Sequence, residues 1–267
     1  MERKFGCLES PSDLRDYRIC KSAMRIDLPE EFRLSNKNIK DQGSVNSCVA
    51  HALSSTLENK FDKNFSTGWI YGYRPLDYYQ GEGMYPREAI KTLYNLGAVE
   101  NKDFNYNVEM QEAKTLVDKS LPLLEVEAED NKLVTAYARL YTESEIKTWL
   151  FTKETPVPFS IATDNLKLDK NNIIQIPNKY PSSGHMMIII GWNSTGFIIQ
   201  NSWGEDWGDK GTAILPYEYE IKEAWGLTLA NQPKDNTIVK PKFNFIRRVL
   251  QIIIEVIKAL LNKGGNI

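Results

Sequence analysis

Length, composition and charge already exclude several classes of protein. The chain has 267 residues, of which 42% are hydrophobic and 25% are charged, with 16 glycines and 12 prolines. These proportions are typical of one large globular domain or two small ones, and they exclude a collagen-like fibre or a disordered tail. The 33 basic and 35 acidic residues give a net charge of −2. Such a balance provides no strong field for binding nucleic acid.

Cysteine content and the absence of long apolar runs bear on the compartment. Cys7, Cys20 and Cys48 allow at most one internal disulfide, so a reducing environment is tolerated. Cys7 and Cys20 are expected to be either two reduced thiols or one local disulfide. Charges interrupt the first 21 residues, and no stretch has 18 uncharged apolar residues, so neither a signal peptide nor a membrane-spanning helix is expected. These features favour a protein that is cytoplasmic or is released without a signal sequence.

The N-terminal half of the chain is predicted to be helical. Residues 1–27 precede it as a polar, turn-rich segment, which favours an extended arm at the surface. Apolar residues at helical spacing then predict a buried helix that begins at Cys48, with Asn46 or Ser47 as its N-cap. The same pattern predicts two further helices, over residues 86–96 and 144–150.

Strands replace helices after Pro156. Short apolar or β-branched runs, separated by Gly, Asn and Pro, predict an antiparallel sheet. These runs are residues 157–162, 186–190, 197–200 and 212–215. Helices followed by strands indicate an α+β protein, in which a cleft between the two halves is the natural place for a site.

The last part of the chain is expected to differ from the rest. Residues 231–242 resemble a linker in composition, and residues 243–267 are predicted to hold an amphipathic helix over about 243–262. Its broad apolar face leaves three alternatives open: docking on the protein's own body, association with a partner or a second copy, and binding to a membrane surface. The charges on its other face have both signs, which weakens the membrane alternative.

A cysteine and two histidines are the candidates for nucleophilic chemistry. Cys48 is placed at the amino end of a helix, where free amides and the helix dipole lower the pKa of a thiol. His185 begins a predicted strand whose partner strand is followed by Asn201, so the Asn201 amide oxygen is expected to orient the imidazole. His51 is expected to be an ordinary helix residue, and no metal site is predicted.

Three sequence blocks resemble the papain-like cysteine peptidases, in particular their bacterial and viral branch. Residues 41–50 (DQGSVNSCVA) are similar to the nucleophile block of that family, 184–192 (GHMMIIIGW) to its histidine strand, and 200–208 (QNSWGEDWG) to its asparagine block. Weaker similarity extends over residues 28–230, which would form the peptidase domain. The resemblance implies a two-lobed fold in which a helical lobe with the nucleophile packs against an antiparallel sheet or barrel lobe.

The resemblance also implies roles for single residues. Cys48 would be the nucleophile, His185 the base and Asn201 its orienting group. Gln42 would donate its side-chain amide to an oxyanion hole that the Cys48 backbone amide completes. Trp203 would shield the hydrogen bond between His185 and Asn201 from water.

Weaker alignment places four residues along the substrate-binding groove: Gly83, Met84, Ser160 and Met186. Residues 1–27 are much shorter than the inhibitory propeptide of eukaryotic relatives. They are therefore expected to be a structural or regulatory strap along the surface or the cleft.

The expected function is that of a cysteine-type endopeptidase, which hydrolyses peptide bonds through a thioester on Cys48. The expected partner is a peptide or protein substrate, and no cofactor and no nucleic acid is implied. Two alternatives remain. A transpeptidase or amidase would use the same site with a different acceptor or amide substrate, and a catalytically silent module would only bind peptides in the cleft.

Overall fold

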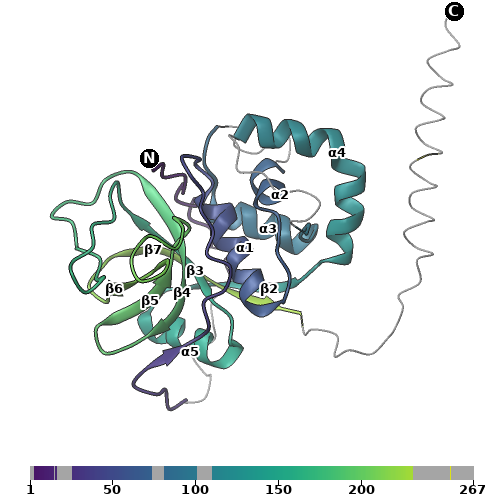
Figure 1. The fold of residues 1–267 in the computed structure, drawn as a ribbon. Helices are drawn as coiled ribbons and strands as arrows, with labels where there is room; N and C mark the ends of the chain where they lie inside the picture. Colours follow the sequence, from purple (N-terminus) through teal and green to yellow (C-terminus); the bar gives the residue numbers. More distant parts are fainter. Residues whose placement is uncertain are drawn as a thin grey trace, which may run out of the picture.

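An antiparallel sheet lies against a group of helices in the structure (Figure 1), which is a computed structural model that describes residues 3–14, 16, 26–73, 81–100, 110–230 and 253. The helices in these ranges are α1 (Cys48–Lys60), α2 (Thr67–Gly72), α3 (Pro86–Asn95), α4 (Met110–Asp130) and α5 (Glu143–Lys153). The strands are β1 (Phe32–Arg33), β2 (Val134–Leu140), β3 (Val157–Ala162), β4 (Gly184–Trp192), β5 (Gly196–Gln200), β6 (Thr212–Pro216) and β7 (Ile221–Leu229). The α+β class expected from the sequence is confirmed.

Helix α1 begins at Cys48, as its apolar spacing predicts. Ser47 is the N-cap residue, but its side chain makes no capping hydrogen bond and lies instead 3.2 Å from Nδ1 of His51. The first amides of α1 are therefore not capped by the preceding side chain. This leaves the backbone N–H groups around Cys48 available to a bound group.

The two other predicted helices are confirmed as α3 and α5. A capping box formed by Thr142 and Glu145 starts α5, because each residue's side chain accepts from the other's backbone amide. Helices α2 and α4 are additional. The sequence conceals α4 because Pro122 interrupts its pattern, and it conceals α2 because six residues are too few for a clear periodicity.

The sheet has the strand order β2-β7-β3-β4-β5-β6, with β1 paired to β4. The four predicted strands correspond to β3, β4, β5 and β6. Strands β2 and β7 pair with each other across a long stretch of sequence, and β7 also pairs with β3. The strand of His185 is thus an interior strand with neighbours on both sides.

Strand β4 contributes to two hydrophobic cores. Met186 and Ile188 belong to a core with the helices α1 to α4, whereas Met187 and Ile189 belong to a second core with α5 and residues of the other strands, β3 and β5 among them. Because both faces of β4 are buried, its sequence is a continuous apolar run rather than an alternation. The helical half and the sheet half therefore meet at this strand.

Residues 3–14 and 16 contain no helix or named strand, in agreement with an extended arm. The expected surface position is wrong for part of the arm, since Gly6, Cys7 and Ser10 are buried. Figure 1 shows this dark purple segment at the junction of the helices and the sheet. The Cys7 thiol is not in a disulfide, whereas Cys20 lies outside the described residues.

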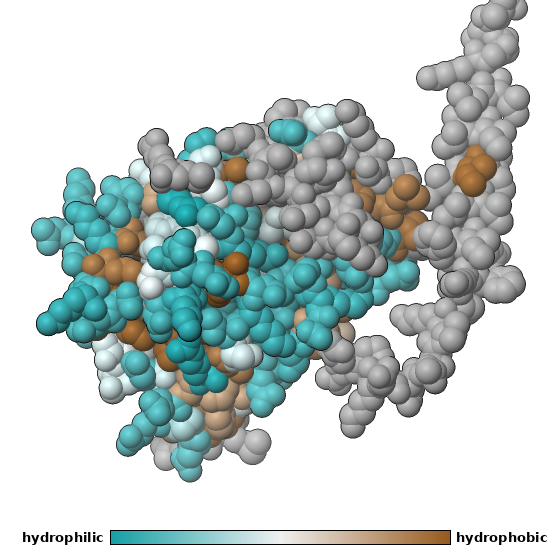
Figure 2. All heavy atoms as spheres, in the orientation of Figure 1, coloured by the Kyte–Doolittle hydropathy of each residue, from teal (hydrophilic) through white to brown (hydrophobic). Residues whose placement is uncertain are grey.

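Hydrophilic side chains predominate on the face shown in Figure 2, where hydrophobic residues are exposed only in small clusters. None of the helices within the described ranges is long and apolar enough to cross a membrane. The linker predicted over 231–242 and the helix predicted over 243–262 lie outside the described residues, except for Ile253.

Candidate active site

Cys48 is the first residue of α1 and is fully buried, where the helix packs against β4. The backbone amides of Met186, Gly6, Val49 and Cys48 itself lie close enough to the sulfur to lower the pKa of the thiol. The contact with Met186 places the thiol beside the residue that follows His185. The predicted nucleophile on α1 and the predicted base on β4 thus lie on elements that pack against each other.

The pKa of the Cys48 thiol differs from the sequence-based expectation. Helix-terminal amides lower it, as predicted, but burial is the larger effect and raises the pKa above its ordinary value. The expectation of a lowered pKa is therefore wrong for this conformation. Its cause is that the thiol has lost contact with water, which a local sequence pattern does not reveal.

His185 and Asn201 are joined by a hydrogen bond of 2.8 Å between Nε2 and Oδ1. The hairpin of β4 and β5 brings them together, because Ile188 pairs with Gln200 in its register. Nδ1 of His185 is buried and has no hydrogen-bond partner among the residues that the structure describes. This nitrogen is the one left for proton transfer.

Burial lowers the pKa of His185 to about 4, against the opposing effect of the Asn201 hydrogen bond. The ring is therefore neutral near pH 7 in this conformation. The Trp203 ring lies 5.0 Å from the His185 ring, between centroids, and is itself buried. This position agrees with the shielding role expected of Trp203.

Gln42 is fully buried and its amide is held at both ends. Nε2 donates to the carbonyl oxygens of Val45 at 2.8 Å and of Lys4 at 3.2 Å, whereas Oε1 accepts from Oγ of Ser202 at 2.7 Å. The amide nitrogen thus points to the side where the Lys4 carbonyl lies. This orientation suits a donor to a carbonyl oxygen.

Ser202 is a positioning residue that the sequence analysis did not assign. Its Oγ fixes the Gln42 amide, and its backbone N–H donates to Oδ1 of Asn201 at 2.8 Å. Its position directly after Asn201 in the asparagine block was the available signal. One residue therefore connects the group that orients the base to the group that faces the oxyanion.

His51 is a helix residue, as predicted. Its Nδ1 lies 3.0 Å from the carbonyl oxygen of Ser47 within α1, and burial lowers its pKa to about 4. Within the described ranges, no three His, Cys, Asp or Glu side chains gather where they could hold a metal ion.

The four residues predicted along the groove all contact the arm or the nucleophile. Gly83 and Met84 border the arm, and the Met84 amide donates to the carbonyl of Gly6 at 2.8 Å. The Ser160 side chain lies close enough to lower the pKa of the Cys7 thiol, and the Met186 amide does the same for Cys48. A role of these four residues in binding substrate stays a prediction.

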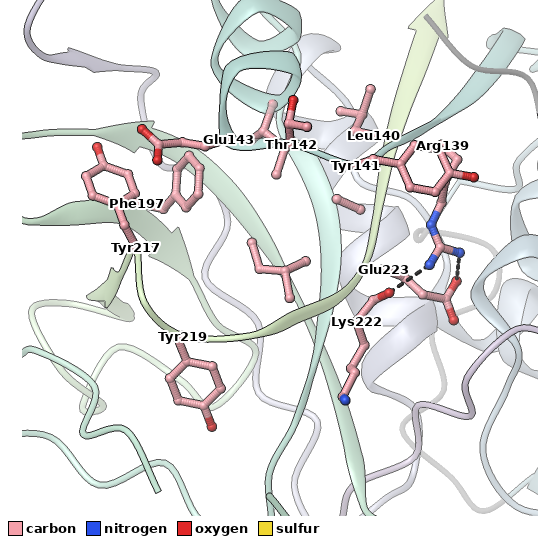
Figure 3. Close-up of a pocket in the computed structure, with 13 residues that line it drawn as sticks. Arg139, Leu140, Tyr141, Thr142, Glu143, Phe197, Tyr217, Tyr219, Lys222 and Glu223 are labelled. Carbon is pink, nitrogen blue, oxygen red and sulfur yellow. Dashed lines mark hydrogen bonds and ion pairs between the residues drawn. The ribbon is translucent and has the colours of Figure 1, made fainter.

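A cavity of about 220 Å³ lies apart from these groups, between the end of β2 and the start of β7 (Figure 3). Tyr141, Tyr217 and Lys222 are among its lining residues, and Cys48 and His185 are not. Glu223 on its wall pairs with Arg139 at 3.0 Å, as the dashed lines in Figure 3 show. This cavity is therefore separate from the residues that the sequence predicts to be catalytic.

Comparisons with known proteins bear on the family of this chain. The family model described as papain family cysteine protease matches residues 25–224. A peptidase C1-like protein of Acanthamoeba polyphaga mimivirus is 25% identical over 84% of this chain and 84% of its own length. A viral cathepsin of Heliothis zea nuclear polyhedrosis virus is 28% identical over 74% of this chain and 55% of its own length.

The fold is also that of a solved structure. Xylellain, a cysteine protease from Xylella fastidiosa, superimposes with a TM-score of 0.71 at 22% identity, over 86% of this chain and 99% of its own. The family match and the fold together define a cysteine-type peptidase, which is a hydrolase of the thiol protease class. The chain belongs to the papain family of cysteine proteases.

Proposed function

We propose that this chain is an endopeptidase in which Cys48 is the nucleophile, His185 the general base and acid, and Asn201 the residue that orients the imidazole. The observation that supports the proposal is that Cys48 and His185 are both fully buried, on elements that pack against each other. The amide of Met186, the residue after His185, lies near the Cys48 sulfur, and Nε2 of His185 is held by Asn201. Peptide or protein is the proposed substrate.

The acylation step uses the nitrogen that Asn201 leaves free. Nδ1 of His185 accepts the thiol proton, and the Cys48 sulfur attacks the carbonyl carbon of the scissile bond. The carbonyl oxygen becomes an oxyanion, which the Gln42 Nε2 and the Cys48 amide stabilise. The C–N bond then breaks as His185 returns the proton to the leaving amine, and a thioester remains on the sulfur.

Deacylation repeats the same proton transfer with water. His185 removes a proton from a water molecule, whose oxygen attacks the thioester carbonyl at the same oxyanion donors. The C–S bond breaks, the carboxylic acid product forms, and Cys48 regains its proton. An amine in place of this water would give transpeptidation, so the acceptor must be tested directly.

The test is a digest of a mixed peptide library in ¹⁸O-labelled water by the full chain, with products read by mass spectrometry. Because residues 3–8 lie over the site, the assay includes Gly6→Ala, in which a Cβ atom would overlap the carbonyl group of Asn46 and displace the segment. Hydrolysis predicts new carboxyl ends that carry ¹⁸O. Joined peptides without the label would indicate a transpeptidase.

Two cysteine variants, made in the Gly6→Ala background, assign the activity to the site. Cys48→Ala should abolish cleavage, whereas Cys20→Ala serves as the matched control and should leave it unchanged. Peptides that bind to both Gly6→Ala and Gly6→Ala with Cys48→Ala, but are cleaved by neither, would identify a silent binding module and overturn the proposal.

A further inference from the structure

The cavity of Figure 3 lies outside the proposed catalytic groups, and its walls come from several parts of the fold. These parts are the end of β2, the start of α5, the start of β5 and the segment from Tyr217 to Ala224. The capping box of Thr142 and Glu145 fixes the start of α5 at its rim. The cavity is therefore built from regular elements and their short connections, as largely pre-formed binding sites are.

The lining of the cavity is rich in apolar and aromatic side chains. Leu140, Ile146 and Ala224 belong to it and are at most 3% exposed. Phe197 and Tyr217 also belong to it, and they pack edge-on with 5.2 Å between the ring centroids. A ring that packs against aromatic rings gains free energy beyond that of the buried area alone. This lining favours an aromatic group.

Two tyrosines of the lining use their hydroxyl groups elsewhere. The hydroxyl of Tyr217 donates to the carbonyl of Asn193 at 2.7 Å, and that of Tyr219 donates to the carbonyl of Ala162 at 3.2 Å. Neither Asn193 nor Ala162 lines the cavity. Both hydroxyl hydrogens are therefore directed away from it, and the rings remain as the lining surface.

The charged side chains of the lining balance one another and have partners. The lining contains two acidic and two basic residues, which are Glu143, Glu223, Arg139 and Lys222. Glu223 pairs with Arg139 at 3.0 Å, Glu143 with Lys147 at 2.6 Å and Lys222 with Glu220 at 2.7 Å. A charged ligand would lose its hydration without gaining a free partner, which costs free energy. The cavity therefore favours an uncharged group.

The size of the cavity suits a single side chain. Its volume of about 220 Å³ exceeds the roughly 150 Å³ of an apolar cavity that holds benzene. It is smaller than the roughly 300–1,000 Å³ of sites that hold drug-sized ligands. Tyr141 at its edge is 49% exposed, so the cavity opens to solvent there. One phenyl, phenol or indole ring is thus the expected occupant.

Glu223 connects the cavity to the predicted substrate groove. It lines the cavity, and it lies directly opposite Ser160, one of the four predicted groove residues, in the pairing of β3 with β7. Residues opposite each other on neighbouring strands have Cβ atoms about 5 Å apart. A polypeptide bound in the groove can therefore reach the cavity with another part of the same chain.

We propose that this cavity binds one uncharged aromatic side chain of a polypeptide substrate, outside the groove that holds the scissile bond. This inference rests on the proposed function, because it names a feature of the substrate for the same reaction. The cavity contains none of the reacting groups, so it stabilises the bound substrate and the transition state equally. It therefore lowers KM for substrates that carry the aromatic residue and leaves kcat unchanged.

The first experiment measures binding of N-acetyltryptophanamide to the full chain by ligand-observed NMR, with N-acetyllysinamide as the charged comparison. The tryptophan probe should bind more tightly than the lysine probe. Tyr141→Ala removes an exposed part of the wall and should weaken binding of the tryptophan probe about 2- to 10-fold. Ile221→Trp adds a ring to the lining and should abolish this binding, because the added ring fills the cavity.

Two matched variants control for exposure and for charge. Tyr94→Ala removes a ring that is 44% exposed and is not part of the lining, so it should leave binding unchanged. Lys222→Gln removes a charge from the lining, and an uncharged ligand should not respond to it. Tyr141→Ala is a substitution at an exposed position, so it tests the cavity even if Ile221→Trp folds poorly.

The second experiment measures hydrolysis in the Gly6→Ala background. Peptides that are cleaved in the library digest are extended at either end by a segment with one tryptophan, or by the same segment with alanine in its place. Tyr141→Ala and Ile221→Trp should raise KM for the tryptophan peptides about 2- to 10-fold and leave kcat unchanged. The alanine peptides should show no change in either constant.

The outcomes distinguish this inference from the proposed function. Unchanged binding of the tryptophan probe in both cavity variants would overturn the site, and equal binding of the lysine probe or a loss in Lys222→Gln would overturn its uncharged class. Loss of probe binding with an unchanged KM for the tryptophan peptides would overturn the substrate as occupant. If no chain hydrolyses any peptide, the proposed function fails, and probe binding still decides whether the cavity takes an aromatic ring.

Discussion

The two histidines of this chain have nearly the same environment and different expected roles. His51 and His185 are both buried, and burial lowers the pKa of each to about 4. His51 turns Nδ1 back to the carbonyl of Ser47 in its own helix, whereas His185 uses Nε2 to bind Asn201, and its Nδ1 has no partner among the residues that the structure describes. A lowered pKa therefore does not distinguish the two rings, and their hydrogen-bond partners do.

The first prediction is that substitution of the two histidines has different effects on activity. In the Gly6→Ala background, His185→Ala should lower kcat/KM by about 100- to 10,000-fold, because the thiol loses its proton acceptor and the leaving amine its donor. His51→Ala should keep kcat within about twofold and lower the melting temperature instead. Steady-state kinetics and thermal unfolding of both variants measure this, and equal losses of kcat/KM would contradict the assignment.

The second prediction concerns the polar partner of each histidine. Asn201→Ala should lower kcat/KM by about 100-fold, because the imidazole loses the hydrogen bond that fixes its orientation. Ser47→Ala is the matched control, since it removes a hydroxyl group 3.2 Å from the other histidine. Kinetics of the two variants in the Gly6→Ala background test this, and an Asn201→Ala enzyme as active as Ser47→Ala would argue against an orienting role.

The third prediction uses acid to compare the rings. Each folded-state pKa lies below the unfolded value of about 6.5, so the unfolded chain binds more protons and stability falls as pH drops from about 6.5 toward 4. At pH 5 each ring should cost about 2 kcal/mol of the free energy of unfolding.

Denaturant unfolding between pH 7.5 and 4.5 measures that cost. His51→Gln should lose about 2 kcal/mol less than the wild type between pH 7.5 and 5, because one titrating ring is gone. Since other acidic groups contribute equally to both chains, the difference between the two curves isolates the ring. Parallel curves would show that burial does not perturb His51.

Local patterns account for much of what the sequence predicted. The turn between β4 and β5 is short, so strand periodicity sufficed to bring His185 and Asn201 together. Helix α1 could be placed because its apolar residues repeat at helical spacing and its first residue is Cys48. The β4–β5 hairpin and α1 together carry Cys48, His185 and Asn201, which are three of the four residues proposed to be catalytic.

Long-range contacts account for what the sequence could not predict. Ser202 hydrogen-bonds to Gln42, 160 positions away. The backbone of residues 6–8 hydrogen-bonds to Met84 and Gly184, which are also distant in the sequence. The rise in the thiol pKa of Cys48 also comes from such contacts, because desolvation depends on what covers the sulfur. No pattern in the sequence predicts that the Gly6 amide lies near the Cys48 sulfur.

Strand β4 restricts insertions and deletions next to His185. Because Met186 and Met187 face different cores, an insertion or deletion of one residue between His185 and Ile189 would exchange the two faces of the strand relative to His185. The register shift between Ile189 and Gly191 lies beyond this segment, so among related sequences changes in length should avoid 185–189. The alternation of side chains between the two faces of β4, rather than any single contact, thus constrains the position of His185.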